Sequence, residues 1–546
     1  MRGTRPLRSL TGPTMALRDA VPPFPERFNL CDDFLDRNLR EGRNDKVCLR
    51  EGDRARTYMQ VSERARRVAA ALRRAGVRPE ERVLIVLPDV LEFADAWFGT
   101  LRAGGVFAMV NPLLHRDAYA EYLDYTKARV VITHTDVLPE IGPAIRASRL
   151  CREAFVVGPD AGGFSPFENV LRAQDPESIQ AEMEPTGPDD LAGWLFTSGS
   201  TGAPKACVHV HADFAYNAEV YAREVVGYCP DDVCLSVPKL FFGYATGTNL
   251  MFPFRFGGSA VLFPERATAD VLFDAIARHR PTLLTSVPTM INAMLRSPRM
   301  ASADLSSVRV CLSAGEALPP ALYSEWKQRT NVEILDGIGS AEMFHIYVTS
   351  RFGDVTPGSL GRLVRGYEAD IVDPEGQLVP VGEPGRMRIR GGSTAICYWG
   401  DREKSAATFQ GDTCTTADIF RRDADGRFWY EGRDDDLLKV SGIWVSPLEI
   451  ENCLLEHPAV AEVCVVGAED EQKLVKPLAF VVLQPGWNGC DETAAALKAH
   501  AKSSIAPHKY PRWFEWRESL PKNDRGKVAR KVLKAEVEAR AKSGAS

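Results

Sequence analysis

The sequence predicts an α/β fold, with a large N-terminal domain of doubly wound sheets and a small mobile C-terminal α+β domain. Short aliphatic runs alternate with helix-length segments through the first two thirds of the chain. Glycine, proline and short alternating strands become frequent after about Val355. A small α/β pattern begins again after the polar run at residues 432–436. Strands that alternate with helices form mostly parallel sheets whose ligands bind near the strand ends.

The first elements are an amphipathic helix and a buried strand. Val61, Ala65, Val68 and Leu72 recur at helical spacing, and Gly76 ends the run. Residues 82–88 then form an aliphatic run bounded by turn residues, which is typical of a buried strand. Similar runs predict further strands at residues 129–135, 191–196, 233–238, 260–264, 283–288, 309–315 and 332–339.

The remaining third contains shorter elements. A strand is expected at 386–390 and a hairpin turn at 423–426, where the sequence reads Asp-Ala-Asp-Gly. Ser446, Pro447 and Glu449 fit a helix start, with serine as the N-cap. The last predicted elements are strands at 460–467 and 478–483 and a helix at 493–502. We therefore place the domains at 1–433 and 434–546.

Composition excludes several classes of protein. The 546 residues carry 67 Lys and Arg against 73 Asp and Glu, a net charge of −6, so overall charge does not drive binding to nucleic acid or a membrane surface. No run approaches the roughly 20 apolar residues of a membrane span. The 12 cysteines include no CxxC pair, which favours reduced thiols. The basic segment before Asp19 has no apolar core, so we expect a cytoplasmic protein, with a transit peptide as the alternative.

The most informative segment is 197–205, which reads TSGSTGAPK and follows the predicted strand at 191–196. Its glycines let backbone amides face outward, its hydroxyls add donors, and Lys205 supplies a positive charge. A polyphosphate needs these groups. The segment is not a Walker A loop, because no Gly-Lys-Ser/Thr closes it. The alternative is a Ser/Gly-rich surface turn.

Five motifs in order give this chain its resemblance to the adenylate-forming superfamily of acyl-CoA synthetases, adenylation domains and luciferases. They are TSGSTGAPK, DGIGSAE from Asp336, TTADIF around Asp418, GRDD from Gly432 and PKNDRGK ending at Lys527. The resemblance extends over roughly residues 28–534. It implies that a carboxylate attacks the α-phosphate of ATP, forming an acyl-adenylate and pyrophosphate, and that a thiol then displaces AMP.

The resemblance also implies residue roles. Lys527 is expected to be the adenylation lysine, Lys205 to bind phosphate and Glu342 to bind Mg²⁺. The residues expected at ATP or AMP are Thr197, Ser198, Gly199, Ser200, Thr201, Gly202, Gly315, Glu316, Asp336, Gly337, Asp418 and Arg433. The expected hinge and CoA face comprises Asp435, Lys439, Ser441 and Gly442.

Three positions depart from the superfamily pattern: Ala206, Ala341 and Ala417. Ala341 matters most, because it stands where threonine usually places a hydroxyl near the α-phosphate. One hydrogen bond to a charged group is worth about 1.5–3 kcal/mol, so its loss slows the reaction without abolishing it.

Three segments resemble the benzoate-CoA ligase branch more than the acetate or fatty-acid branches. They are KLFFGY from Lys239, EMFHI from Glu342 and VSGIWVSPLEIE from Val440. An aromatic acid fits a slot of aromatic and aliphatic walls. The expected pocket residues are Gly243, Tyr244, Gly339, His345 and Ile346. Core packing is the alternative for Tyr244 and His345. The pair His209 and His211 is interpreted as a strand end rather than a metal site.

These observations predict an AMP-forming aryl-CoA ligase that uses ATP, Mg²⁺ and coenzyme A on a benzoate-type acid. Its expected partners are an aromatic carboxylate, ATP and CoA, with a carrier protein as the partner under the first alternative below. Neither nucleic acid nor a membrane is expected, and the chain is expected to be a monomer or homodimer. One alternative is an aryl acid adenylation enzyme that loads a carrier-protein phosphopantetheine. The other is a weakly active or degenerate nucleotide- and acyl-binding homologue, which Ala341 motivates.

Overall fold

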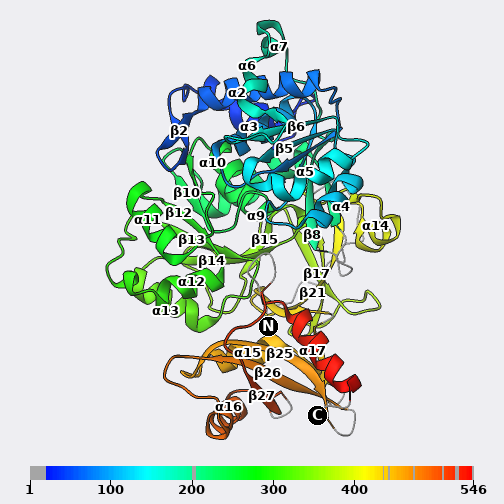
Figure 1. Ribbon diagram of the computed structural model, residues 1–546. Coiled ribbons are helices and arrows are strands. Elements are labelled where there is room, and N and C mark those ends of the chain that lie inside the picture. Colours follow the sequence, from blue (N-terminus) through cyan, green and yellow to red (C-terminus); the bar gives the residue numbers. More distant parts are fainter. Residues whose placement is uncertain are drawn as a thin grey trace, which may run out of the picture.

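The structure is a computed structural model that describes residues 20–198, 204–434, 436–440, 443–470, 474–506, 509–522 and 528–543. Figure 1 shows a large N-terminal domain and, beneath it, a small C-terminal domain drawn in orange and red. This division into a large and a small domain agrees with the prediction.

The first sheet of the large domain has the strand order β19-β9-β8-β4-β3-β5-β6-β7. Its strands are mostly parallel, but β9 runs antiparallel to both of its neighbours. Their bounds are β3 Arg82–Val86, β4 Val106–Met109, β5 Val130–His134, β6 Glu153–Val157, β7 Ser165–Pro166, β8 Leu191–Ser198, β9 Pro204–Val210 and β19 Cys397–Tyr398.

Alternating side chains bury both faces of this sheet. Val83 and Ile85 pack in one apolar cluster with α2 (Tyr58–Arg74) and α3 (Leu91–Arg102). Leu84 and Val86 pack in another with α4 (Arg116–Thr126) and α5 (Leu138–Ala147). Because successive strand residues point to opposite faces, one aliphatic run serves both layers. The doubly wound arrangement is therefore confirmed here.

The second sheet has the order β16-β15-β14-β13-β12-β10-β11-β1-β2. Helices α11 (Ala269–His279), α12 (Pro288–Arg296) and α13 (Pro320–Thr330) contribute to one apolar cluster with its strands. The strand bounds are β1 Val47–Glu51, β2 Arg54–Thr57, β10 Val233–Ser236, β11 Ser259–Leu262, β12 Leu283–Ser286, β13 Val310–Ala314, β14 Ile334–Gly339, β15 Ile346–Thr349 and β16 Arg362–Leu363.

A third, antiparallel sheet completes the large domain. Its path is β17-β18-β21-β20, and β22 pairs with β21 through the predicted turn at 423–426, where Gly426 has φ +80°. The elements are β17 Glu368–Val372, β18 Pro384–Arg390, α14 Arg402–Thr408, β20 Phe409–Gln410, β21 Thr413–Arg422 and β22 Phe428–Arg433.

Short helical elements connect these layers. They are η2 Asp32–Asp36, α1 Arg37–Arg40, η3 Thr135–Val137, α6 Phe167–Arg172, α7 Pro176–Gln180, α8 His211–Asn217, η4 Ala218–Val226, α9 Gly243–Thr246, η5 Gly247–Met251, α10 Phe252–Arg255, η6 Pro298–Ala301 and η7 Ala341–Met343.

The small domain places α17 beside the sheet β25-β26-β27 (Figure 1). The Ser446 hydroxyl accepts a hydrogen bond from the amide of Glu449, as predicted for an N-cap. The elements are β23 Leu438–Val440, β24 Ile443–Val445, α15 Pro447–Leu455, β25 Val460–Glu469, β26 Val475–Leu483, α16 Asp491–Ser504, β27 Trp513–Trp516 and α17 Arg530–Ser543.

In the part of the chain that the structure describes, no helix is both long and apolar enough to span a membrane. The predicted strands and helices all appear, most of them within two or three residues of the expected bounds. The hairpin of β1 and β2 was not predicted, because β2 (Arg54–Thr57) consists of polar residues apart from Ala55 and shows no apolar alternation.

Candidate active site

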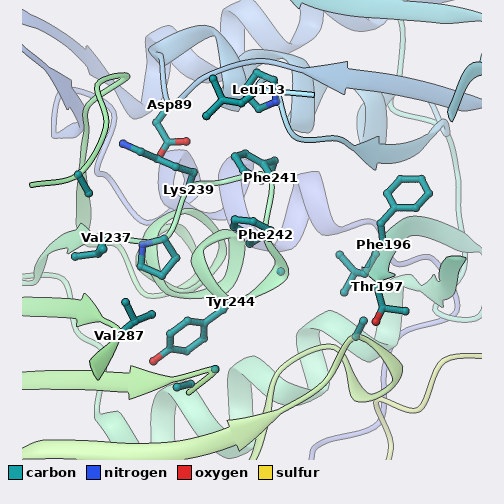
Figure 2. Close-up of a pocket in the computed structure, with 18 of the residues that line it drawn as sticks. Asp89, Leu113, Phe196, Thr197, Val237, Lys239, Phe241, Phe242, Tyr244 and Val287 are labelled. Carbon is teal, nitrogen blue, oxygen red and sulfur yellow. The ribbon is translucent and has the colours of Figure 1, made fainter. Parts of the chain in front are cut away.

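A cavity of about 2070 Å³ opens where the two large sheets, the third sheet and the small domain meet. Its lining residues include Lys205 from β9, Glu342 after β14 and Asp418 from β21. Lys522 and Val528 of the small domain also line it. Figure 2 shows part of this wall, with Phe241, Phe242 and Tyr244 on one side and Thr197 on another. The cavity therefore gathers residues that are far apart in the chain.

The predicted phosphate segment joins β8 to β9. Thr197 pairs with Lys205 across these antiparallel strands, so both residues lie at the cavity wall. Ser198 ends β8, whereas Gly199, Ser200, Thr201 and Gly202 lie outside the described residues. The two described ends of this segment therefore lie at the wall of one cavity.

Glu342 lies in the short turn η7, and its carboxylate meets two other groups. Its Oε1 accepts a hydrogen bond of 2.7 Å from the Tyr398 hydroxyl and lies 3.9 Å from Lys205 Nζ. Lys205 Nζ is also 4.0 Å from the centre of the Tyr398 ring. Sequence reasoning missed Tyr398, since nothing in the local pattern CYWGD shows which distant residues it contacts.

The register of strands β21 and β22 brings Asp418 and Arg433 together. They are direct partners in the β21–β22 pair, with Arg433 Nη1 3.8 Å from Asp418 Oδ1. The Tyr430 hydroxyl donates to the same oxygen at 3.5 Å. A carboxylate held in this way at the cavity wall is suited to accept hydrogen bonds from a ribose.

Gly315 and Glu316 follow β13 and also line the cavity. Gly315 has φ +88°, a left-handed conformation that glycine adopts without strain. Glu316 Oε2 accepts hydrogen bonds from the amide and hydroxyl of Thr289, at 3.1 and 2.7 Å. The turn is thereby joined to the first turn of α12.

Asp336 and Gly337 lie in β14 but are not among the residues that line the cavity. The side chain of Asp336 is buried, and its Oδ1 has no hydrogen-bond partner among the described residues. Burial raises the pKa of this carboxyl to about 7. A bulkier residue at 337 would meet Val348 and Thr349 of the adjacent strand β15.

The aromatic end of the cavity contains the predicted residues Gly243, Tyr244, Gly339, His345 and Ile346. The His345 Nε2–H donates to the carbonyl of Tyr244 at 3.1 Å, and the two ring centres are 5.3 Å apart. The His345 ring packs so closely on Gly247 that a Cβ there would lie 2.5 Å from it. Burial lowers the pKa of His345 to about 3, so the ring is neutral. His345 is therefore both a packed core residue and part of the wall.

Tyr244 presents an unsatisfied group at this end. Its hydroxyl is buried and has no hydrogen-bond partner among the described residues. In Figure 2 its ring projects below Phe242, with the hydroxyl pointing away from the polypeptide that carries it. A buried hydroxyl without a partner costs free energy that a polar substrate group can recover.

His209 lies near the end of β9, as predicted, and the described residues contain no cluster of three or more His, Cys, Asp or Glu side chains that could hold a metal ion. His209 Nδ1 lies 2.9 Å from Asp213 Oδ2, and its Nε2 lies 2.7 Å from the Ala341 carbonyl. The Nδ1 of His211 instead accepts from the amide of Leu30. Sequence reasoning missed the contact of His209 with Ala341, which supports the turn carrying Glu342.

The donor set fits a magnesium ion bound mainly through a nucleotide. Mg²⁺ commonly takes one or two protein carboxylates and completes its shell with phosphate oxygens and water. Glu342 is such a carboxylate, and no hydrogen bond to its second oxygen, Oε2, occurs among the described residues. The side chain of Glu342 is 15% exposed, so it is accessible from the cavity.

On the small-domain side, the cavity is lined by Lys522, Val528 and Arg530. Arg530 donates to both oxygens of Glu451, at 2.7 and 3.1 Å, and its Nε is 3.7 Å from Asp436. Lys439 belongs to β23. The predicted residues Asp435, Ser441, Gly442 and Lys527 lie outside the described residues.

Comparison with known proteins identifies the family of this chain. Residues 35–399 match the AMP-binding enzyme family, and residues 449–527 match the AMP-binding enzyme C-terminal domain. A benzoate--CoA ligase from Thauera aromatica is 41% identical over 94% of this chain and 98% of its own length. A 4-hydroxybenzoate--CoA/benzoate--CoA ligase from Rhodopseudomonas palustris is 40% identical over 93% of this chain and 94% of its own length.

Two solved structures share the fold. An anthranilate CoA ligase in complex with anthranoyl-AMP has a TM-score of 0.91 and 38% identity, covering 96% of this chain and 100% of its own. A benzoate CoA ligase from Burkholderia xenovorans has a TM-score of 0.86 and 40% identity, covering 93% of this chain and 99% of its own. The chain therefore belongs to the AMP-binding enzyme family, the adenylate-forming superfamily, in its benzoate-CoA ligase branch, and is an AMP-forming acid-CoA ligase.

Proposed function

We propose that this protein activates a benzoate-type acid through an aryl-adenylate and transfers the aryl group to CoA, releasing AMP and pyrophosphate. The observation that carries the proposal is that one cavity joins a charged end, with Lys205 and Glu342, to an aromatic end, with Tyr244 and His345. Two relatives that are 40–41% identical and align with over 90% of this chain are named as a benzoate--CoA ligase and a 4-hydroxybenzoate--CoA/benzoate--CoA ligase.

The charged end suits the first half-reaction. The acid's carboxylate attacks the α-phosphorus of ATP, a P–O bond forms, and the bond to pyrophosphate breaks. Such a step depends on positioning and on neutralising charge. Lys205 supplies a cation at the phosphates, and Asp418 accepts from the ribose. Mg²⁺ bound at Glu342 would neutralise phosphate charge. Lys527 is proposed to reach the reacting carboxylate, since Lys522 and Val528 on either side of it line the cavity.

The aromatic end suits the acid. Tyr244, Phe242, His345 and Ile346 form walls of aromatic and aliphatic groups, and neutral His345 adds no charge that would compete for the carboxylate. Gly243 adds no side chain to this wall, where a Cβ would be in ordinary van der Waals contact with Leu195 at 3.4 Å. A planar ring fits such a slot.

We also propose that the domains divide at Arg433 and Asp434. Arg433 ends β22, and the small domain begins its own packing at β23. Asp435 is the proposed hinge, with Lys439, Ser441 and Gly442 on the face that meets CoA. Rotation of a small domain about a short polar linker is a recognised kind of switch. It would withdraw Lys527 after adenylation.

The test is AMP release from ATP and Mg²⁺ across substituted benzoates and short aliphatic acids, with and without CoA. CoA-dependent AMP with one benzoate dominating supports the proposal and identifies the acid. AMP or pyrophosphate turnover that CoA does not change would favour a carrier-protein acceptor. No turnover, where a control ligase is active, would favour a binding protein without catalysis.

A further inference from the structure

Tyr398 joins two charged residues of the phosphate end that the sequence places far apart. Its hydroxyl donates to Glu342 Oε1 at 2.7 Å, and the face of its ring lies 4.0 Å from Lys205 Nζ. The residue is 5% exposed and borders the cavity. One side chain thus contacts both the anion and the cation of the site.

Its backbone is held independently of those charges. Strand β19 pairs antiparallel with β9, and Tyr398 lies opposite Cys207, two residues from Lys205. The amide of Tyr398 donates to the Ser405 hydroxyl at 3.0 Å, and its ring packs on Phe409 at 4.9 Å between centres. The position of the hydroxyl is therefore fixed by contacts that do not involve the side chains of Glu342 or Lys205.

The spacing of the two charges shows what this contact achieves. Lys205 Nζ and Glu342 Oε1 are 3.9 Å apart, beyond a direct hydrogen bond, although their side chains are only 21% and 15% exposed. At this separation the opposite charges attract each other without a direct hydrogen bond between them. Tyr398 occupies one oxygen of Glu342 and offers its ring to the ammonium, which is a favourable cation–π position. Both charges thereby remain available to a third group.

We propose that Tyr398 is a positioning residue that holds Glu342 and Lys205 apart and oriented for a metal–triphosphate ligand. This inference rests on the proposed function and deepens it, because it assigns the separation of metal-binding and phosphate-binding groups to one side chain. The hydroxyl orients the metal-binding carboxylate of Glu342, and the ring holds the phosphate-binding side chain of Lys205 in position.

Two substitutions separate these roles. Tyr398→Phe removes the hydroxyl and keeps the ring, whereas Tyr398→Leu removes both. Tyr367→Phe is the matched control: its hydroxyl is also buried and hydrogen-bonded, to Ser393 at 2.6 Å, but Tyr367 does not line the cavity. ATP binding is measured by calorimetry with excess EDTA and with Mg²⁺, and AMP formation is measured across a Mg²⁺ titration. Melting temperatures check that each variant is folded.

For Tyr398→Phe, we expect ATP binding in Mg²⁺ to weaken about tenfold, the lower end of what one hydrogen bond to a charged group contributes. ATP binding in EDTA should stay within about twofold of wild type, because the ring still seats Lys205. Tyr398→Leu should weaken both. Tyr367→Phe should change neither.

The inference would be overturned if ATP binding by Tyr398→Phe depended on Mg²⁺ as strongly as ATP binding by wild type. It would also be overturned if Tyr367→Phe lost as much ATP affinity in Mg²⁺ as Tyr398→Phe. A wild-type protein that binds ATP in a metal-dependent way, yet forms no AMP with any acid, would refute the proposed function while leaving the role of Tyr398 open to the same calorimetric comparison.

Discussion

The Nε2–H of His209 donates to the carbonyl oxygen of Ala341 at 2.7 Å, from a histidine that is fully buried. His209 is in turn 2.9 Å from Asp213 through its other ring nitrogen. Ala341 opens the turn that carries Glu342. A buried side chain of β9 therefore supports the backbone of the turn at the position where the superfamily usually has threonine.

Ala341→Thr should leave the rate of AMP formation unchanged or raise it by up to about tenfold, because the added hydroxyl can reach a phosphate oxygen while His209 still holds the backbone. The measurement is kcat for adenylation at saturating ATP and acid. A sharp fall, with an unchanged melting temperature, would show instead that the site is built around alanine.

His209→Gln should lower kcat about tenfold, since the Ala341 carbonyl loses its fixed donor and the turn bearing Glu342 can shift. The KM for the aromatic acid should change little. His211→Gln is the control, because His211 is equally buried but bonds to Leu30 instead. Equal losses in both variants would indicate general destabilisation.

Lys527→Ala should nearly stop adenylation and leave thioester formation from supplied aryl-adenylate intact. The physical reason is that the lysine's charge is needed where negative charge develops on the carboxylate and α-phosphate, a need confined to the first half-reaction. The two halves are measured as pyrophosphate release and as thioester formation. Loss of both halves to the same extent contradicts the assignment.

Tyr244→Phe should leave unsubstituted benzoate activation unchanged or slightly improved, because the hydroxyl that it removes has no partner among the described residues. Benzoates with a hydroxyl or amino group that reaches this position should lose about tenfold in kcat/KM. A panel of ring-substituted acids gives the comparison. If every acid loses activity alike, Tyr244 shapes the pocket rather than pairing with a substituent.

Asp336→Asn should change how stability depends on pH. Burial raises the folded-state pKa of Asp336 from 3.8 to about 7. The contribution of the protonated carboxyl to the free energy of unfolding is therefore fully present below pH 3.8 and is lost as the pH rises through 7. Asparagine cannot ionise, so the variant should gain about 1–3 kcal/mol relative to wild type between pH 5 and pH 8. Melting temperatures at these two pH values test this. A difference between variant and wild type that is the same at both would mean that the carboxyl does not titrate in this range.

Much of the fold and many candidate site residues could be predicted because their signals are local. The periodicity of residues 61–76 predicts α2, and aliphatic runs predict β3 and β13. Motifs around Lys205, Glu342 and Asp418 identify candidates by order, and the structure brings all three to one cavity. Asp336 was expected at ATP or AMP from its motif. Its side chain is buried and does not line the cavity, which the residue type alone does not reveal.

The sequence by itself determined the α/β architecture, the order of the domains and the chemistry of the charged residues, because helical and strand periodicity and short motifs depend on neighbours in the chain. The tertiary structure decided which distant side chains meet. Tyr398 reaches Glu342, and His209 reaches Ala341, only because β19, β9 and the turn after β14 converge. Such contacts follow from sheet order and register, which no local pattern specifies.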